Sequence, residues 1–130
     1  TLPYVPTAEQ RSADYPLMLT TGRVLQHYNV GTMTRRTPHR DLEDADYLEI
    51  NPQDAAVAGI DDGAWVRITS RYGKAVVRSR ITGRVTSVLI FLSFHFPESH
   101  TTARTSSRAD PESRCPEYKV TAVRIEKGRE

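Results

Sequence analysis

The sequence is poor in the residues that mark several common protein classes. Its 130 residues include one cysteine, Cys115, so no internal disulfide can form and no second thiolate is available for a zinc site. The longest apolar run, residues 88–92, is far too short to span a bilayer. No secretory signal, Gly-Lys-Ser/Thr phosphate loop or G-x-S-x-G nucleophile elbow is present. The single cysteine fits a reducing, cytoplasmic compartment.

A large excess of positive or of negative charge is also absent. Eighteen Lys and Arg residues oppose sixteen Asp and Glu residues, which gives a formal net charge of +2, and the sequence pI is near 8.8. This mild excess permits an anionic ligand without requiring nucleic acid. The apolar fraction of 38% and the length predict one globular domain. The chain begins at Thr1 without a methionine, so we expect a piece of a longer protein or a processed product.

Turn signals and period-two alternation predict a mainly β domain. Residues 1–14 are punctuated by proline and are expected to form a linker or N-terminal arm. Strands are predicted at residues 15–20, 47–50, 65–70, 74–82, 88–93 and 118–126. Alternation in the third and fourth of these places Val66, Ile68, Val77 and Ile81 on candidate core faces. Asn51 as N-cap, Pro52 at the first position and Gly59 as the terminating glycine predict one helix. Many short strands with few helices favour a small β-barrel.

Two long connections interrupt this pattern, at residues 21–45 and 98–117. Loops of this length inside a compact domain are often binding loops. The first connection ends in an acidic stretch at 41–46, which is expected to be a short helix or a loop. Its earlier part combines glycines, an asparagine, hydroxyls, a histidine and arginines. Such groups suit a phosphorylated, nitrogen-rich ligand.

Four spaced motifs resemble one known family. Residues 21–36 (TGRVLQHYNVGTMTRR), 51–56 (NPQDAA), 70–74 (SRYGK) and 110–125 (ending CPEYKVTAVRI) occur in the order found in the C-terminal domain of molybdopterin-dependent oxidoreductases. The nearest resemblance is to the catalytic subunits of formate dehydrogenases. It extends over nearly all of the chain, from about residue 15 to residue 126.

The resemblance implies a double-psi β-barrel of about six strands with one or two short helices, occupying residues 15–130. It implies that this barrel clamps a bis-molybdopterin guanine dinucleotide cofactor carrying molybdenum or tungsten. Most contacts to the cofactor, and the Cys or selenocysteine that ligates the metal, would lie in other domains of the parent catalytic subunit. The parent enzyme would oxidise formate to carbon dioxide and pass electrons to further subunits. The isolated chain is expected to be inactive, with neither nucleic acid nor a membrane as partner.

The resemblance also implies which residues face the cofactor. These are Gly22, Arg23, His27, Asn29, Thr34, His95, Thr102, Tyr118 and Lys119. Lys119 would supply a positive charge without demanding fixed geometry. Thr102 stands where the family usually has asparagine, so one hydroxyl replaces an amide with two donors and an acceptor.

The residues themselves leave alternatives open. Arg23 is either a ligand contact or a solvated side chain in a tight turn, and Lys119 is either a ligand contact or a protective edge-strand lysine. His27 is either a ligand contact or a surface residue, and His95 either faces the cofactor or points outward from a strand end.

Further along the first connection, Thr32, Thr34, Arg35 and Arg36 form a second anion-binding segment, or the two arginines pair with the acidic residues Asp41, Glu43 or Asp44. A third alternative is that the arginines are buried at the contact with the rest of a larger enzyme.

The sequence leaves two alternative functions open. The chain can be a stand-alone small subunit that resembles the dinucleotide-binding subunit of formylmethanofuran dehydrogenases. It can also be a basic β-barrel that binds nucleic acid or protein through the Trp65/Arg67 face or the Arg78/Arg80 face.

Overall fold

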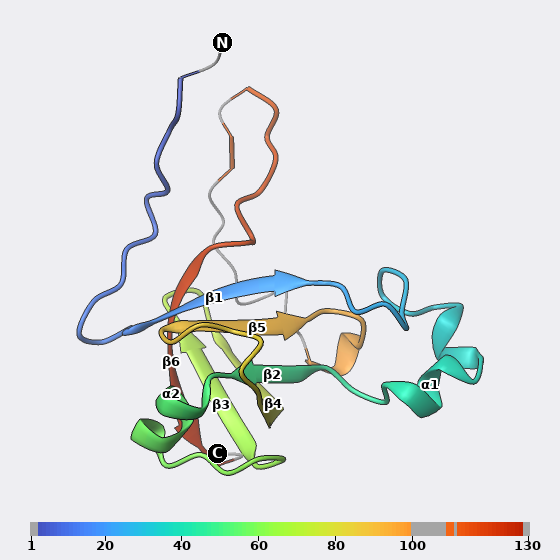
Figure 1. Ribbon diagram of the computed structural model, residues 1–130. Coiled ribbons are helices and arrows are strands. Elements are labelled where there is room, and N and C mark those ends of the chain that lie inside the picture. The colour runs from blue at the N-terminus through green and yellow to red at the C-terminus, as the bar shows by residue number, and fades with distance from the viewer. Residues whose placement is uncertain (1–2, 100–108, 111, 129–130) are drawn as a thin grey trace.

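Six strands close into a single barrel in the computed structural model, which describes residues 3–99, 109–110 and 112–128. The strands are β1 (Leu17–Gly22), β2 (Tyr47–Ile50), β3 (Trp65–Ser70), β4 (Lys74–Ile81), β5 (Leu89–Ser93) and β6 (Thr121–Lys127). Their order around the barrel is β1-β5-β2-β4-β3-β6 (Figure 1). The prediction of a mainly β domain with about six strands is confirmed. None of the helices in the described part of the chain has the length and apolar character to cross a bilayer.

The barrel combines two parallel and four antiparallel strand pairs, and this pairing sets the position of the loops. β1 pairs in parallel with β5, with Gly22 opposite Ser93, and β2 pairs in parallel with β4. The other four pairs are antiparallel. The chain therefore leaves β1 and β5 at the same end of the barrel, and it enters β6 at that end as well.

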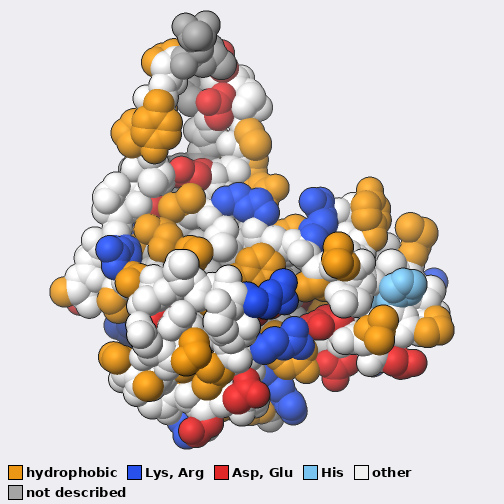
Figure 2. Space-filling view, in the orientation of Figure 1, with side chains coloured by type: hydrophobic (Ala, Val, Ile, Leu, Met, Phe, Trp, Pro, Cys, Tyr) orange, Lys and Arg blue, Asp and Glu red, His pale blue; other side chains and the backbone are white. Residues whose placement is uncertain are grey.

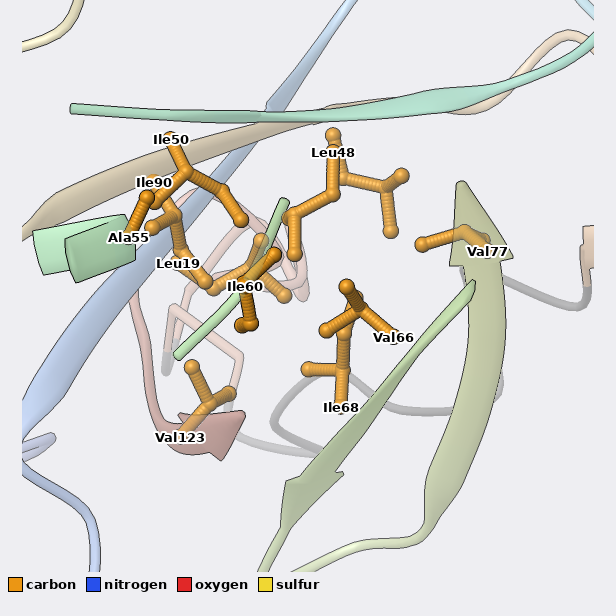
Figure 3. Packing of buried hydrophobic residues seen from close by; sticks show 11 residues of the cluster. Leu19, Leu48, Ile50, Ala55, Ile60, Val66, Ile68, Val77, Ile90 and Val123 are labelled. Carbon is orange, nitrogen blue, oxygen red and sulfur yellow. The ribbon is translucent and has the colours of Figure 1, made fainter. Parts of the chain in front are cut away.

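The barrel interior is an apolar core built from alternate residues of each strand. The cluster consists of Leu19, Leu48, Ile50, Ala55, Ile60, Val66, Ile68, Val77, Ile90, Leu92 and Val123 (Figure 3). The predicted core positions Val66, Ile68 and Val77 are buried, and Ile81 packs against the cluster from a partly buried position. Each buried aliphatic side chain contributes about 1.5–3 kcal/mol. A closed barrel has no free edge, and with its own core it meets the requirements of a domain that folds independently.

Helix α2 (Pro52–Ala58) closes one end of this core as the sequence predicted. The Asn51 side chain accepts a hydrogen bond from the Gln53 amide at 3.0 Å, and Gly59 ends the helix with a φ of 63°. Ala55 of the helix belongs to the core cluster. The N-cap and the left-handed glycine therefore set both boundaries of the helix.

The first long connection folds into a lobe beside the barrel, which we call the loop lobe (residues 23–46). It carries the short helices η1 (Thr34–Arg36) and α1 (His39–Leu42), seen at the right of Figure 1. A third short helix, η2 (Pro97–Ser99), follows β5. The acidic stretch at 41–46 is helical only at its start, because Glu43 and Asp46 are buried and act as hydrogen-bond or ion-pair partners.

The N-terminal arm is attached to the barrel by a buried carboxylate. Glu9 is 4% exposed and accepts hydrogen bonds from the Tyr72 hydroxyl at 2.5 Å and the Ala122 amide at 3.0 Å, and it pairs with Arg71 at 3.3 Å. Beyond this anchor, the arm runs beside residues 109–110 and 115–117 (Figure 1). A cavity of about 450 Å³ lies between the arm and these residues.

Three strands begin later than predicted, each for a local reason. β1 begins at Leu17 because a turn closes from Tyr15 to Ser12 and Pro16 has no amide hydrogen to donate. β5 begins at Leu89 because Val88 has a φ of 72°. β6 begins at Thr121, and the preceding residues Tyr118 and Lys119 form a turn.

Candidate functional site

Three segments converge at one end of the barrel to form the candidate site. They are the start of the loop lobe after β1, the residues that follow β5, and the turn at Tyr118 and Lys119 before β6. The convergence follows from the strand pairing, because Gly22 lies opposite Ser93 and Leu19 lies opposite Thr121. The second and third segments therefore meet the first without any local sequence signal, although Phe94 and Tyr118 lie 71 and 95 residues after Arg23.

The space between these segments is a cavity that we call the ring pocket. It has a volume of about 270 Å³ and is lined by Arg23, Asn29, Val30, Phe94 and Tyr118. The Lys119 ammonium lies 5.6 Å from the centre of the Phe94 ring and 5.2 Å from the centre of the Tyr118 ring. Four of the predicted site residues, Arg23, Asn29, Tyr118 and Lys119, are thus brought together. Phe94 also lines this pocket.

Arg23 and Asn29 are hydrogen-bonded to each other at the start of the loop lobe. The Asn29 side-chain oxygen accepts from Nε of Arg23 at 3.2 Å and from Nη2 at 2.8 Å. The guanidinium also lies 5.5 Å from the Phe94 ring centre. Neither Nη1 of Arg23 nor the side-chain nitrogen of Asn29 donates to any other described residue. The pair is therefore fixed in position and still presents donors to a ligand.

Lys119 and Tyr118 are attached to the end of β1 by two hydrogen bonds. The Lys119 ammonium donates to the Thr21 carbonyl at 2.5 Å, and the Thr21 hydroxyl donates to the Tyr118 carbonyl at 2.9 Å. Lys119 lies in a turn of a closed barrel, so it does not serve as an edge-strand lysine. The two bonds place its charge beside the aromatic rings.

Gly22, at the end of β1, allows the Phe91 side chain of the paired strand β5 to lie close to the backbone. A Cβ at Gly22 would lie 2.5 Å from Cε2 of Phe91, on the strand paired with β1. A side chain here would displace the Phe91 ring. The glycine therefore shapes the turn that carries Arg23.

His95 lies beneath the ring pocket and is fully buried. Its Nε2 accepts a hydrogen bond from the Val24 amide at 2.9 Å, and its Nδ1 donates to the Asn29 carbonyl at 2.5 Å. This pattern requires the neutral ring with its proton on Nδ1. The ring neither points outward nor lines the pocket, and it holds both sides of the turn that presents Arg23 and Asn29.

His27 and Thr34 brace the interior of the loop lobe in a similar way. His27 is 5% exposed, its Nε2 donates to the Glu43 carbonyl at 2.7 Å, and its Nδ1 accepts from the Thr34 hydroxyl at 2.9 Å. The ring meets Phe96 edge-on with 5.2 Å between centroids. Both ring nitrogens are engaged within the chain, so the structure gives His27 a supporting position. The predicted ligand contacts of His27 and Thr34 stay predictions, and Thr102 lies outside the described residues.

Asp46 is a structural residue of the site that the sequence reasoning missed. This carboxylate is 3% exposed and accepts from the Ser93 and Ser99 hydroxyls, both at 2.6 Å. It also accepts from the amides of His95 at 2.9 Å and Phe96 at 3.0 Å. These four bonds fix the segment after β5. An acidic residue just before a strand is too common a pattern to have revealed this role.

Arg35 is paired, although not with the acidic residues expected from the sequence. Its Nη2 donates to Glu98 at 2.6 Å, and its guanidinium lies 4.8 Å from the Phe96 ring centre. The hydrogen bond from Arg35 holds the pKa of Glu98 below its usual range. Glu43 pairs instead with Arg80 at 2.8 Å. The predicted ion pairs of Arg35 and Arg36 with residues 41–44 are therefore wrong.

Comparison with solved structures identifies the fold. The barrel superimposes on part of acetylene hydratase from Pelobacter acetylenicus with a TM-score of 0.76 and 19% identity, covering 88% of this chain and 18% of that one. The fold is the double-psi β-barrel that the sequence resemblance implied.

Sequence comparison finds relatives at much higher identity. The chain is 45% identical over 115 residues to F420-dependent formate dehydrogenase 2 subunit alpha of Methanococcus maripaludis, covering 88% of this chain and 17% of that protein. It is 40% identical over 130 residues to a nitrate reductase of Symbiobacterium thermophilum, covering 96% of this chain and 17% of that protein. The chain thus spans less than a fifth of the length of these relatives. Residues 17–122 match the family described as Molydopterin dinucleotide binding domain, and the chain belongs to that family.

Proposed function

We propose that this domain holds molybdopterin guanine dinucleotide, in its bis form, from one side within a larger molybdenum or tungsten oxidoreductase. The observation that carries the proposal is the ring pocket, where Phe94 and Tyr118 stand beside the charges of Arg23 and Lys119. Aromatic faces suit a flat heterocycle, and guanidinium and ammonium groups suit its phosphates and ring carbonyls. This set of donors fits the cofactor that the family name describes.

Each residue would contribute binding or orientation. Arg23 and Asn29 would donate hydrogen bonds from the atoms that their mutual pairing leaves free, and Lys119 would place a charge without fixing geometry. His95 would keep Val24 and Asn29 in the positions that the pocket needs. The metal-bearing group supplies the redox chemistry when bound. The residues of this chain supply position and charge.

Cofactor content of the parent protein tests this proposal. We would purify the full-length protein that contains this chain, release guanine nucleotide from it with acid, and quantify the nucleotide and the metal. Arg23→Gln and Phe94→Ala are expected to lower both contents by about tenfold if the pocket contacts are made. Arg11→Gln, an exposed arginine of the arm, is the matched control. Unchanged content in both pocket variants would refute the proposal.

We further propose that the parent enzyme oxidises formate to carbon dioxide in the cytoplasm and passes electrons to partner subunits. The support is the identity with formate dehydrogenase alpha subunits, which is 45% for one of them. The nitrate reductase at 40% is a specific rival. Assays of the full-length protein with formate plus an electron-accepting dye, and with nitrate plus a reduced dye, separate the two. Activity with nitrate alone would overturn the formate assignment.

The size of the native polypeptide distinguishes this reading from that of a separate small subunit. A native chain several times heavier than 14.7 kDa is expected for a catalytic subunit. A native chain of about this mass would favour a stand-alone dinucleotide-binding subunit.

A further inference from the structure

A second hollow, the arginine pocket, lies next to the ring pocket and is lined by positive charge. It has a volume of about 340 Å³ and is lined by Val30, Gly31, Thr32, Arg35, Arg36, Arg40 and Pro97. Three of these residues are arginines and none is acidic. Figure 2 shows Lys and Arg side chains down the middle of the visible face, with the loop lobe to the right of them.

Two of the three arginines are not fixed by an ion pair within the described part of the chain, although the charge of Arg40 helps to lower the pKa of Glu98. Arg36 and Arg40 are exposed, and neither forms a hydrogen bond through its side chain or an ion pair with any residue between 3 and 99, at 109–110 or between 112 and 128. Asp44, a nearby carboxylate in sequence, accepts from the Tyr47 hydroxyl instead. Neighbouring guanidinium groups repel each other, so a bound anion is favoured between them.

Arg35 and Gly31 form a fixed wall of the pocket. Arg35 is held by Glu98 and by the Phe96 ring. Gly31 has a φ of 67°, and a Cβ there would lie 2.6 Å from Cδ and 2.7 Å from Cγ of Arg35. The arginine stem therefore lies directly on the Gly31 backbone. One guanidinium is preorganised, while Arg36 and Arg40 are free to close on a ligand.

We propose that the arginine pocket binds a phosphoryl group. The planar guanidinium groups can pair with phosphate oxygens in a bidentate manner, and the Thr32 hydroxyl adds a further donor. Val30 lines both hollows, so the arginine pocket adjoins the ring pocket. A nucleotide whose ring occupies the ring pocket can extend its phosphates past Val30, and this link rests on the proposed function.

Calorimetric titration of the 130-residue chain tests the proposal with three probes. Inorganic pyrophosphate reports on the arginine pocket alone, guanosine on the ring pocket alone, and guanosine diphosphate on both together. The test variant is Arg36→Gln/Arg40→Gln. The control is Arg11→Gln/Arg84→Gln, which removes the same net charge from exposed arginines that do not line either pocket. Thermal unfolding of each variant confirms that it remains folded.

The expected result is a loss of pyrophosphate affinity of about tenfold in Arg36→Gln/Arg40→Gln and little change in the control. Guanosine diphosphate should bind more tightly than guanosine, and the test variant should remove that difference. Equal losses in both double variants would indicate a general charge effect and overturn the proposal, as would an unchanged affinity for pyrophosphate. Absence of guanosine binding would count against the ring pocket alone, because pyrophosphate still reports on the arginines.

Discussion

In the barrel, the large side chains that are fully buried are mainly aliphatic, with Leu48, Ile50 and Ile90 at 0% exposure. In the loop lobe and the segment after β5, the buried groups are largely polar: His27, Glu43, Asp46 and His95 are all 8% exposed or less. Apolar packing is non-directional and tolerates small shifts. Hydrogen bonds between buried groups fix distance and direction. The barrel thus supplies stability, and the polar network supplies the position of the site.

The border between these regions is where the candidate site lies. His95 follows β5 directly and bonds to both sides of the turn after β1. Asp46 precedes β2 and fixes the residues around His95. The strands therefore fix the geometry of the ring pocket through a small number of buried hydrogen bonds.

The largest expected effect is in the barrel. Leu48→Ala should lower the free energy of unfolding by about 3 kcal/mol, because it leaves a cavity among the core side chains on β2. Denaturant unfolding measures this loss, and the site should lose its structure only together with the whole domain. Val57→Ala, at a side chain that is 91% exposed, is the control. If the site lost its structure in Leu48→Ala while the barrel stayed folded, the barrel would not be the part that supplies stability to the site.

The next effect is in the polar network. Asp46→Asn should lower the free energy of unfolding by about 2 kcal/mol, because an amide cannot accept all four hydrogen bonds that the carboxylate receives. Amide hydrogen exchange should accelerate at residues 93–99 more than in the strands. Asp41→Asn, an exposed acidic residue, is the control. Uniform acceleration over the whole barrel would contradict a local role for Asp46.

A smaller loss is expected for His95→Gln. Glutamine can replace a donor and an acceptor but cannot span the same distance between the Val24 amide and the Asn29 carbonyl, so we expect a loss of about 1 kcal/mol. Guanosine affinity should fall while pyrophosphate affinity changes little, because His95 supports the ring pocket. His39→Gln, at an exposed histidine, should change neither. Equal losses for both probes would indicate that the two pockets are one unit.

The barrel itself could be predicted from the sequence to a large extent. Alternation in β3 and β4 and the N-cap of α2 are local signals, and Val66, Ile68, Val77 and Asn51 lie where these signals placed them. The strand order depends on long-range pairing, such as that of β1 with β5, which no local pattern encodes; the family resemblance supplied the type of barrel.

The sequence identified residues of the site better than it identified what each of those residues does. Arg23, Asn29, Tyr118 and Lys119 do meet at one pocket or beside it. The burial of His95 could not be predicted, because its partners are 66 and 71 residues away in sequence. The roles of side chains in the network depend on pairings that no local pattern encodes.

The smallest expected effect concerns the exposed rim of the lobe, where Glu98 pairs with Arg35. The hydrogen bond from Arg35 lowers the pKa of Glu98, so the pair stabilises the fold above the pKa of the unfolded chain, and this contribution disappears as the pH falls through the folded pKa. Because the Glu98 side chain is 67% exposed, the contribution should be below about 0.5 kcal/mol. An NMR titration of the Glu98 carboxyl should give a midpoint that rises in Arg35→Gln, while denaturant unfolding of the barrel hardly changes. An unchanged midpoint would remove Arg35 as the cause, and a large loss of stability would mean that the lobe supports the barrel as much as the barrel supports the lobe.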